Sequence, residues 1–88
     1  MDEYDALRGE LEIVVMDVVA GGPNTSKLHH SIRRVIEARL RRRIGTWLKD
    51  FDVTVGPDST GVGIEVAVRL QTRQEARMIR LRTGAPIR

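Results

Sequence analysis

The sequence predicts one small α+β domain with an N-terminal helix, a long central amphipathic helix, an antiparallel β-hairpin packed on that helix, and a short C-terminal helix. Three observations predict it. Apolar residues recur every three or four positions over residues 26–48, and they alternate with polar residues over 51–55 and 62–70. Thr72 is followed three residues later by Glu75, a signature of a helix start. An 88-residue chain has room for one core, so we expect a single domain over residues 1–84 and a loose tail over 85–88.

The first segment, residues 2–20, fits two periods. Tyr4, Leu7 and Leu11 recur at helical spacing behind an acidic first turn, which suits the positive end of a helix dipole. Residues 13–19 are rich in β-branched side chains, which favour strands. We favour one amphipathic helix over about residues 3–20. A short helix followed by a buried strand is the alternative.

The second segment predicts a long helix from about Ser26 to Leu48. Asn24, Thr25 and Ser26 offer three residues that can cap its N-terminus, and the apolar positions that follow keep helical spacing. Gly45 is the weak point of this helix, because glycine is a poor helix former. A helix of this length would be the element against which the rest of the chain packs.

Two arginines of this helix, Arg39 and Arg43, fall inside the arc of its apolar face, as the 100° step between helix residues requires. One interpretation is that their stems cover apolar surface while their charged heads reach water. The other is that they form buried ion pairs with carboxylates of the acidic N-terminal segment or of a neighbouring subunit. Arg39 and Arg43 are therefore candidate buried ion-pair residues.

The third segment predicts a β-hairpin. Phe51, Val53 and Val55 alternate with polar residues, a second alternating run covers residues 62–71, and the glycine-rich residues 56–61 lie between them. The second strand is expected to extend beyond the first. Because a two-stranded sheet is rarely stable alone, the free edge of residues 61–71 pairs with the first segment, pairs with another chain or stays exposed, and we favour pairing with a neighbouring chain.

The last segment predicts a short helix that runs from the Thr72–Glu75 capping signature to about Arg82 and ends at Gly84. Ala76 and Ile79 would face inward in such a helix.

Charge is distributed unevenly along the chain. Residues 1–20 contain six acidic residues and one arginine, whereas residues 21–88 contain fourteen basic and six acidic residues, so the net charge of +3 conceals an acidic head and a basic body. The head either folds back on the body of its own subunit or attracts the body of another subunit.

Several function classes are excluded by the residues present. The chain has no cysteine, its two histidines, His29 and His30, are adjacent and diverge on a helix, and no nucleophile, dinucleotide or P-loop motif occurs. We therefore expect no enzyme activity, no cofactor and no metal. No apolar run approaches the length of a membrane span, and an acidic start is unlike a secretory signal. The expected location is the cytoplasm or an assembled particle, such as a virion.

Eight further arginines are candidate interface or phosphate contacts: Arg33, Arg34, Arg41, Arg42, Arg69, Arg73, Arg77 and Arg80. Only three residues are aromatic, so base-stacking platforms are scarce and nucleic acid would be held through its phosphates. The uneven charge and the small core favour instead a structural assembly subunit that acts through protein–protein contacts in a homo- or hetero-oligomer. In outline, a long helix followed by a hairpin is loosely similar to small subunits of phage tails and contractile injection baseplates. A nucleic-acid-binding protein is the alternative.

Overall fold

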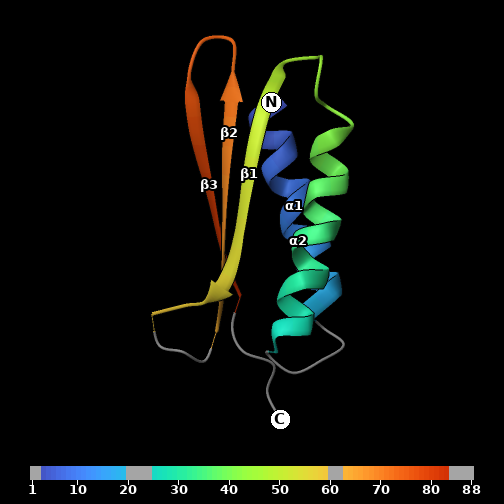
Figure 1. Ribbon diagram of the computed structural model, residues 1–88, viewed down its shortest axis with the longest axis vertical. Helices are drawn as coiled ribbons and strands as arrows, with labels where there is room; N and C mark the ends of the chain where they lie inside the picture. The colour runs from blue at the N-terminus through green and yellow to red at the C-terminus, as the bar shows by residue number, and fades with distance from the viewer. Residues whose placement is uncertain (1–2, 20–24, 60–62, 84–88) are drawn as a thin grey trace.

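The computed structural model describes residues 3–19, 25–59 and 63–83. Two helices come first and three strands follow. They are α1 (Glu3–Val19), α2 (Ser26–Arg41), β1 (Leu48–Pro57), β2 (Ile64–Thr72) and β3 (Ala76–Thr83). The strands form one antiparallel sheet in the order β1-β2-β3. Figure 1 shows both helices on the same side of this sheet, so the chain is a two-layer α+β fold. The tail expected over residues 85–88 lies outside the described residues.

The first segment is the single helix α1, which confirms the helical interpretation over the helix-and-strand alternative. Its buried side chains, Leu7, Leu11, Val14, Val15 and Val19, recur every three or four residues. Three β-branched residues of its C-terminal half, Val14, Val15 and Val19, are thus accommodated in a helix, because they lie on the face that packs in the core.

The long central helix predicted from Ser26 to Leu48 is wrong in its second half. Thr25 caps α2, its Oγ1 accepting a hydrogen bond from the Leu28 amide at 3.2 Å, but the helix ends at Arg41. Gly45 has a φ of +92°, in the left-handed region that glycine favours. Its amide donates to the Leu48 carbonyl at 3.1 Å, so residues 42–47 form the connection that turns the chain from α2 into β1.

The predicted hairpin exists as β1 and β2, but its second strand does not extend beyond its first. β1 has ten residues and β2 has nine, paired from Leu48 opposite Thr72 to Pro57 opposite Ile64. Strand β2 is also the central strand of the sheet, bonded to β1 on one side and to β3 on the other. The expectation that residues 61–71 offer a free edge to another chain is therefore wrong.

The predicted C-terminal helix is also wrong, because residues 76–83 form strand β3. The Thr72–Glu75 signature closes a β-hairpin instead of starting a helix: Thr72 Oγ1 accepts from the amides of Gln74 and Glu75, at 3.2 and 3.0 Å. A threonine hydroxyl can accept hydrogen bonds from nearby backbone amides both at a helix start and in a hairpin turn. The strand forms because β2 has an open edge on this side, and a helix over residues 76–83 would leave the backbone groups of that edge unpaired.

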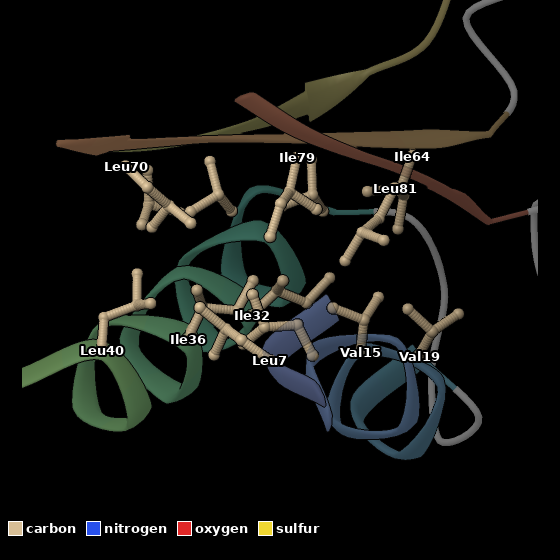
Figure 2. Packing of buried hydrophobic residues seen from close by; sticks show 14 of the residues in the cluster. Leu7, Val15, Val19, Ile32, Ile36, Leu40, Ile64, Leu70, Ile79 and Leu81 are labelled. Carbon is tan, nitrogen blue, oxygen red and sulfur yellow. The ribbon is translucent and has the colours of Figure 1, made fainter. Parts of the chain in front are cut away.

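The core lies between the helices and the sheet. Figure 2 shows Leu70, Ile79, Ile64 and Leu81 of the sheet pointing toward the side chains of the helices. The residues that meet them from the helices include Leu7, Val15, Ile32, Ile36 and Leu40, all fully buried or nearly so. Helix α2 packs beside β1 and helix α1 beside β3. In the described part of the chain, no helix is long and apolar enough to cross a membrane.

Candidate interaction surfaces

The two helices that form the outer layer carry opposite charge. Helix α1 contains five carboxylates and one arginine, whereas α2 contains five lysines and arginines and one glutamate. The helices lie next to each other (Figure 1), so the acidic head and part of the basic body share one side of the molecule. The surface of the helical layer is therefore divided into an acidic half and a basic half.

Helix α1 has an apolar stripe on its solvent side, away from the core. Ala6, Gly9, Ile13 and Met16, which we call the α1 stripe, are all exposed and follow one another at spacings of three and four. The Ile13 and Met16 side chains are each 66% exposed, the largest exposure among the large hydrophobic residues of the described chain. This stripe was not predicted from the sequence. The helical spacing already indicates it, because Ile13 and Met16 fall outside the arc set by Leu7, Leu11 and Val15.

Carboxylates flank the α1 stripe on both sides. The helical step places Asp5 and Glu12 along one side of it and Glu10 and Asp17 along the other. Glu12 Oε1 lies 3.3 Å from Arg8 Nε in an exposed ion pair. The stripe is thus an apolar surface with an acidic border.

Helix α2 has a complementary surface on its solvent side. A shallow hollow of about 410 Å³ is lined by Ser31, Val35 and Ala38, with Arg34, Arg39 and Arg42 around it. We call it the α2 hollow. Its small side chains leave room for an incoming apolar side chain, and its arginines supply positive charge at the rim.

The eight arginines proposed from sequence do not form one surface. Arg33, Arg34, Arg41 and Arg42 belong to α2 and the turn after it, and Arg73 and Arg77 to the β2–β3 hairpin. Arg69 and Arg80 alternate with buried Val68, Leu70, Ile79 and Leu81, so they lie on the sheet face opposite the helices.

Five of those eight arginines already pair with a carboxylate of their own chain. Arg33 and Arg41 both contact Glu37, at 3.3 and 3.9 Å. Arg69 pairs with Asp50 at 4.0 Å, Arg77 with Glu75 at 3.0 Å and Arg80 with Glu65 at 3.6 Å. Positive charge on the sheet face and at the hairpin is therefore largely compensated locally, which lowers its attraction for phosphates.

Arg43 and Arg39, the two arginines expected to form buried ion pairs, have different surroundings. Arg43 Nη2 lies 3.1 Å from Glu10 Oε1, and its Nη1 donates to the Arg39 carbonyl at 3.0 Å. The Arg43 and Glu10 side chains are 26% and 31% exposed, so the pair is partly buried. Arg39 lies half-buried at the rim of the α2 hollow. The Glu10–Arg43 pair joins the acidic helix α1 to the connection that follows α2.

One hollow lies at the end of the molecule where α1 begins. It measures about 420 Å³ and is lined by Tyr4, Trp47 and Leu70 with charged residues of the β2–β3 hairpin. Arg77, which borders it, lies 4.5 Å from the centre of the Tyr4 ring and also pairs with Glu75. These contacts tie α1 to the hairpin. In residues 3–19, 25–59 and 63–83, no three His, Asp or Glu side chains are grouped so that they could hold a metal ion.

No family model matches this chain, and no curated protein or solved structure is significantly similar to it.

Proposed function

We propose that this protein is a non-catalytic assembly subunit that pairs with a second copy of itself through its helical layer. The observation that carries the proposal is that one surface holds both an exposed apolar stripe with an acidic border and a basic hollow floored by small side chains. The stripe supplies apolar side chains and negative charge, and the hollow supplies space for a side chain and positive charge, so the two are complementary. Burying Ile13 or Met16 would contribute roughly 1.5–3 kcal/mol per side chain.

A two-fold axis that runs parallel to the helices, between them, would place α1 of each copy over α2 of the other. Both contacts would then form at once, and the interface would close with no surface left for further growth. An axis perpendicular to the helices would instead place α1 against α1, and the acidic borders of the two stripes would repel each other. Charge therefore favours the first arrangement.

The expected dimer is weak. The helices have 17 and 16 residues, so the layer measures about 25 Å by 20 Å and would bury roughly 1,000 Å² in total over both copies. That area is at the lower limit for a specific interface, which suggests a dissociation constant on the order of 1–100 µM. Opposite charges would contribute at low ionic strength and would be screened at about 1 M salt, where the Debye length is about 3 Å.

Light scattering coupled to gel filtration tests the proposal. We expect a mass that rises toward twice the monomer mass with concentration at about 0.01 M salt, with dimerisation at least tenfold weaker at about 1 M. Ile13→Glu should give a monomer. Met78→Glu is the matched control, because Met78 is also exposed, at 44%, but lies on the sheet face opposite the helices. A monomeric wild-type protein at all concentrations would contradict the proposal.

Charge exchange tests the arrangement of the helices. One variant carries Glu12→Arg and Asp17→Arg, which puts an arginine on each side of the α1 stripe and brings the net charge of α1 from −4 to zero; a second carries Arg34→Glu and Arg42→Glu, which makes the rim of the α2 hollow acidic. Each variant alone should be monomeric, whereas the mixture should form a heterodimer, because the new arginines of one α1 then face the new glutamates at the other copy's α2 hollow, and the unchanged acidic α1 faces the unchanged basic α2. Failure of the mixture to pair, with both variants folded, would rule out contact between α1 and α2 of different copies.

The same chromatography separates self-assembly from the nucleic-acid alternative. A mass increase with a protein-like ratio of absorbance at 260 and 280 nm supports self-assembly. A mass increase that comes with a nucleic-acid-like ratio and disappears after nuclease treatment would support phosphate contacts by the α2 arginines instead.

A further inference from the structure

The two edges of the sheet differ in how their outer backbone groups are used. On the β3 edge, the Tyr4 hydroxyl donates to the Met78 carbonyl at 3.0 Å, and Arg8 Nη2 donates to the Arg80 carbonyl at 3.4 Å. Helix α1 thus occupies hydrogen-bonding positions that another strand would need. Strand β1 is the opposite edge, and it pairs with β2 alone among the described strands.

The register identifies the outward-facing backbone groups of β1. The Asp58 amide donates to the Gly63 carbonyl at 3.0 Å, so the even-numbered positions of β1 bond to β2. Phe51, Val53 and Val55 alternate with these positions, so their amides and carbonyls point away from the sheet. Their side chains point toward the core, where Val53 is buried. An irregularity between Leu48 and Asp50 limits this row at one end, and Pro57, which has no amide hydrogen, limits it at the other.

A groove runs beside this edge, between β1 and α2. It has a volume of about 360 Å³ and is lined on the strand side by residues 52–55 and on the helix side by His29, His30 and Arg33. A groove between a strand edge and a helix is the shape that accepts an added strand: the edge supplies hydrogen bonds and the groove accepts alternate side chains. The helix side has a net positive charge, because Arg33 and Arg41 share the single carboxylate of Glu37. Asp52 is the only acidic residue in the lining, and its position in the strand alternation directs it to the other face of the sheet.

We propose that the β1 edge and its groove bind an extended acidic segment of another protein, which adds to the sheet as a fourth strand. A second copy of this chain suits the site less well. Two β1 strands paired across Val53 would bring the basic sides of both α2 helices together at the new interface, with Arg33 of one copy facing Arg33 of the other. An acidic segment places opposite charge there instead. This binding is independent of the proposed dimer, which uses the outer surface of the helical layer.

Fluorescence anisotropy with a labelled peptide of about eight residues, alternating Glu and Val, tests the proposal. We expect saturable binding, and at least tenfold weaker binding by the same peptide with Lys in place of Glu. N-methylation of every second residue should abolish binding in one of the two possible phases and preserve it in the other, because only alternate amides face the β1 edge. Equal binding by the Glu and Lys peptides, or by both N-methylated phases, would overturn the proposal, as would no binding at all.

Protein variants locate the site. Arg33→Gln should weaken binding of the Glu peptide about three- to tenfold, while Arg34→Gln, the neighbouring arginine on the outer surface of α2, should leave it unchanged. Val55→Pro removes an outward amide and should reduce binding at least tenfold in a protein whose circular dichroism is retained. If that variant does not fold, the N-methylated peptides still decide the question. A Val55→Pro variant that binds peptide normally but loses dimer mass would assign the edge to a second copy and refute the proposal.

Discussion

At the scale of single residues, the partly buried Glu10–Arg43 pair carries more weight than the exposed ion pairs around it. Its side chains are 26% and 31% exposed, against 43% and 50% for Arg8 and Glu12. Less solvent screening makes the charge interaction stronger, and the pair joins residues 33 positions apart in sequence.

A double-mutant cycle with Glu10→Gln and Arg43→Gln should therefore give a coupling energy of about 0.5–1.5 kcal/mol in urea unfolding. The matched cycle, Arg8→Gln with Glu12→Gln, should give about 0–0.5 kcal/mol, as exposed pairs one helical turn apart usually do. Equal coupling energies in the two cycles would show that Glu10 and Arg43 are as fully hydrated in solution as the surface pair.

The candidate interface arginines show that the position of a side chain depends on the secondary structure around it. The sequence identifies which arginines exist, but the direction of each side chain depends on the element that holds it. Arg73, Arg77 and Arg80 share one side of a helix, yet in the hairpin and β3 they separate, with Arg80 on the sheet face opposite the helices and Arg77 above the Tyr4 ring. The sequence alone therefore leaves open whether these arginines form one surface.

At the scale of elements, β3 shows most clearly how local signals can mislead. Residues 72–75 carry a genuine capping signature, and arginines spaced by three and four suggest one face of a helix. The alternation of Ile79 and Leu81 with Arg80 and Arg82 was the competing signal. Pairing with the open edge of β2, a contact that a local pattern does not encode, determines the outcome.

Truncation of two neighbouring residues tests the strand assignment. Ile79→Ala should cost about 2–4 kcal/mol of unfolding free energy, because Ile79 is fully buried. Met78→Ala should cost less than about 1 kcal/mol, because Met78 is 44% exposed on the opposite face. Urea unfolding measures both. Similar large losses for the two variants would contradict the alternation of a strand.

Two glycines, one inside α1 and one in the turn after α2, give a second test at this scale. Gly9 lies inside α1 with open space where a Cβ would stand, so Gly9→Ala should stabilise the monomer by about 0.5–1 kcal/mol. Gly45→Ala should destabilise it by about 1 kcal/mol, because its φ of +92° strains any residue with a Cβ. Thermal unfolding at low concentration compares them. A stabilised Gly45→Ala protein would show that the turn after α2 relaxes without penalty.

At the scale of the whole molecule, the acidic head folds beside the basic body and is only partly neutralised by it. Within the acidic border of the α1 stripe, Glu10 pairs with Arg43, whereas Glu12 and Asp17 are exposed. The sequence predicted the division of charge and the first helix, but the topology depends on which strand takes the centre of the sheet. With β2 at the centre, β1 is left as an edge that pairs with no further strand among the described residues.

Thermal stability should therefore depend on protein concentration. A partner that binds the folded state at about 100 times its dissociation constant adds about 2.7 kcal/mol. In a self-dimer the free partner is the undimerised chain, so the gain at that total concentration is smaller, about 1–2 kcal/mol. For a domain of this size each kcal/mol raises Tm by about 4–8 °C, so dilute and concentrated samples at low salt should differ by about 5–15 °C. High salt should reduce this difference by weakening the contact between acidic α1 and basic α2. Differential scanning calorimetry on wild type and Ile13→Glu measures it, with the variant expected to melt at one temperature throughout. A wild-type Tm that is independent of concentration at low salt would contradict dimerisation through the helical layer.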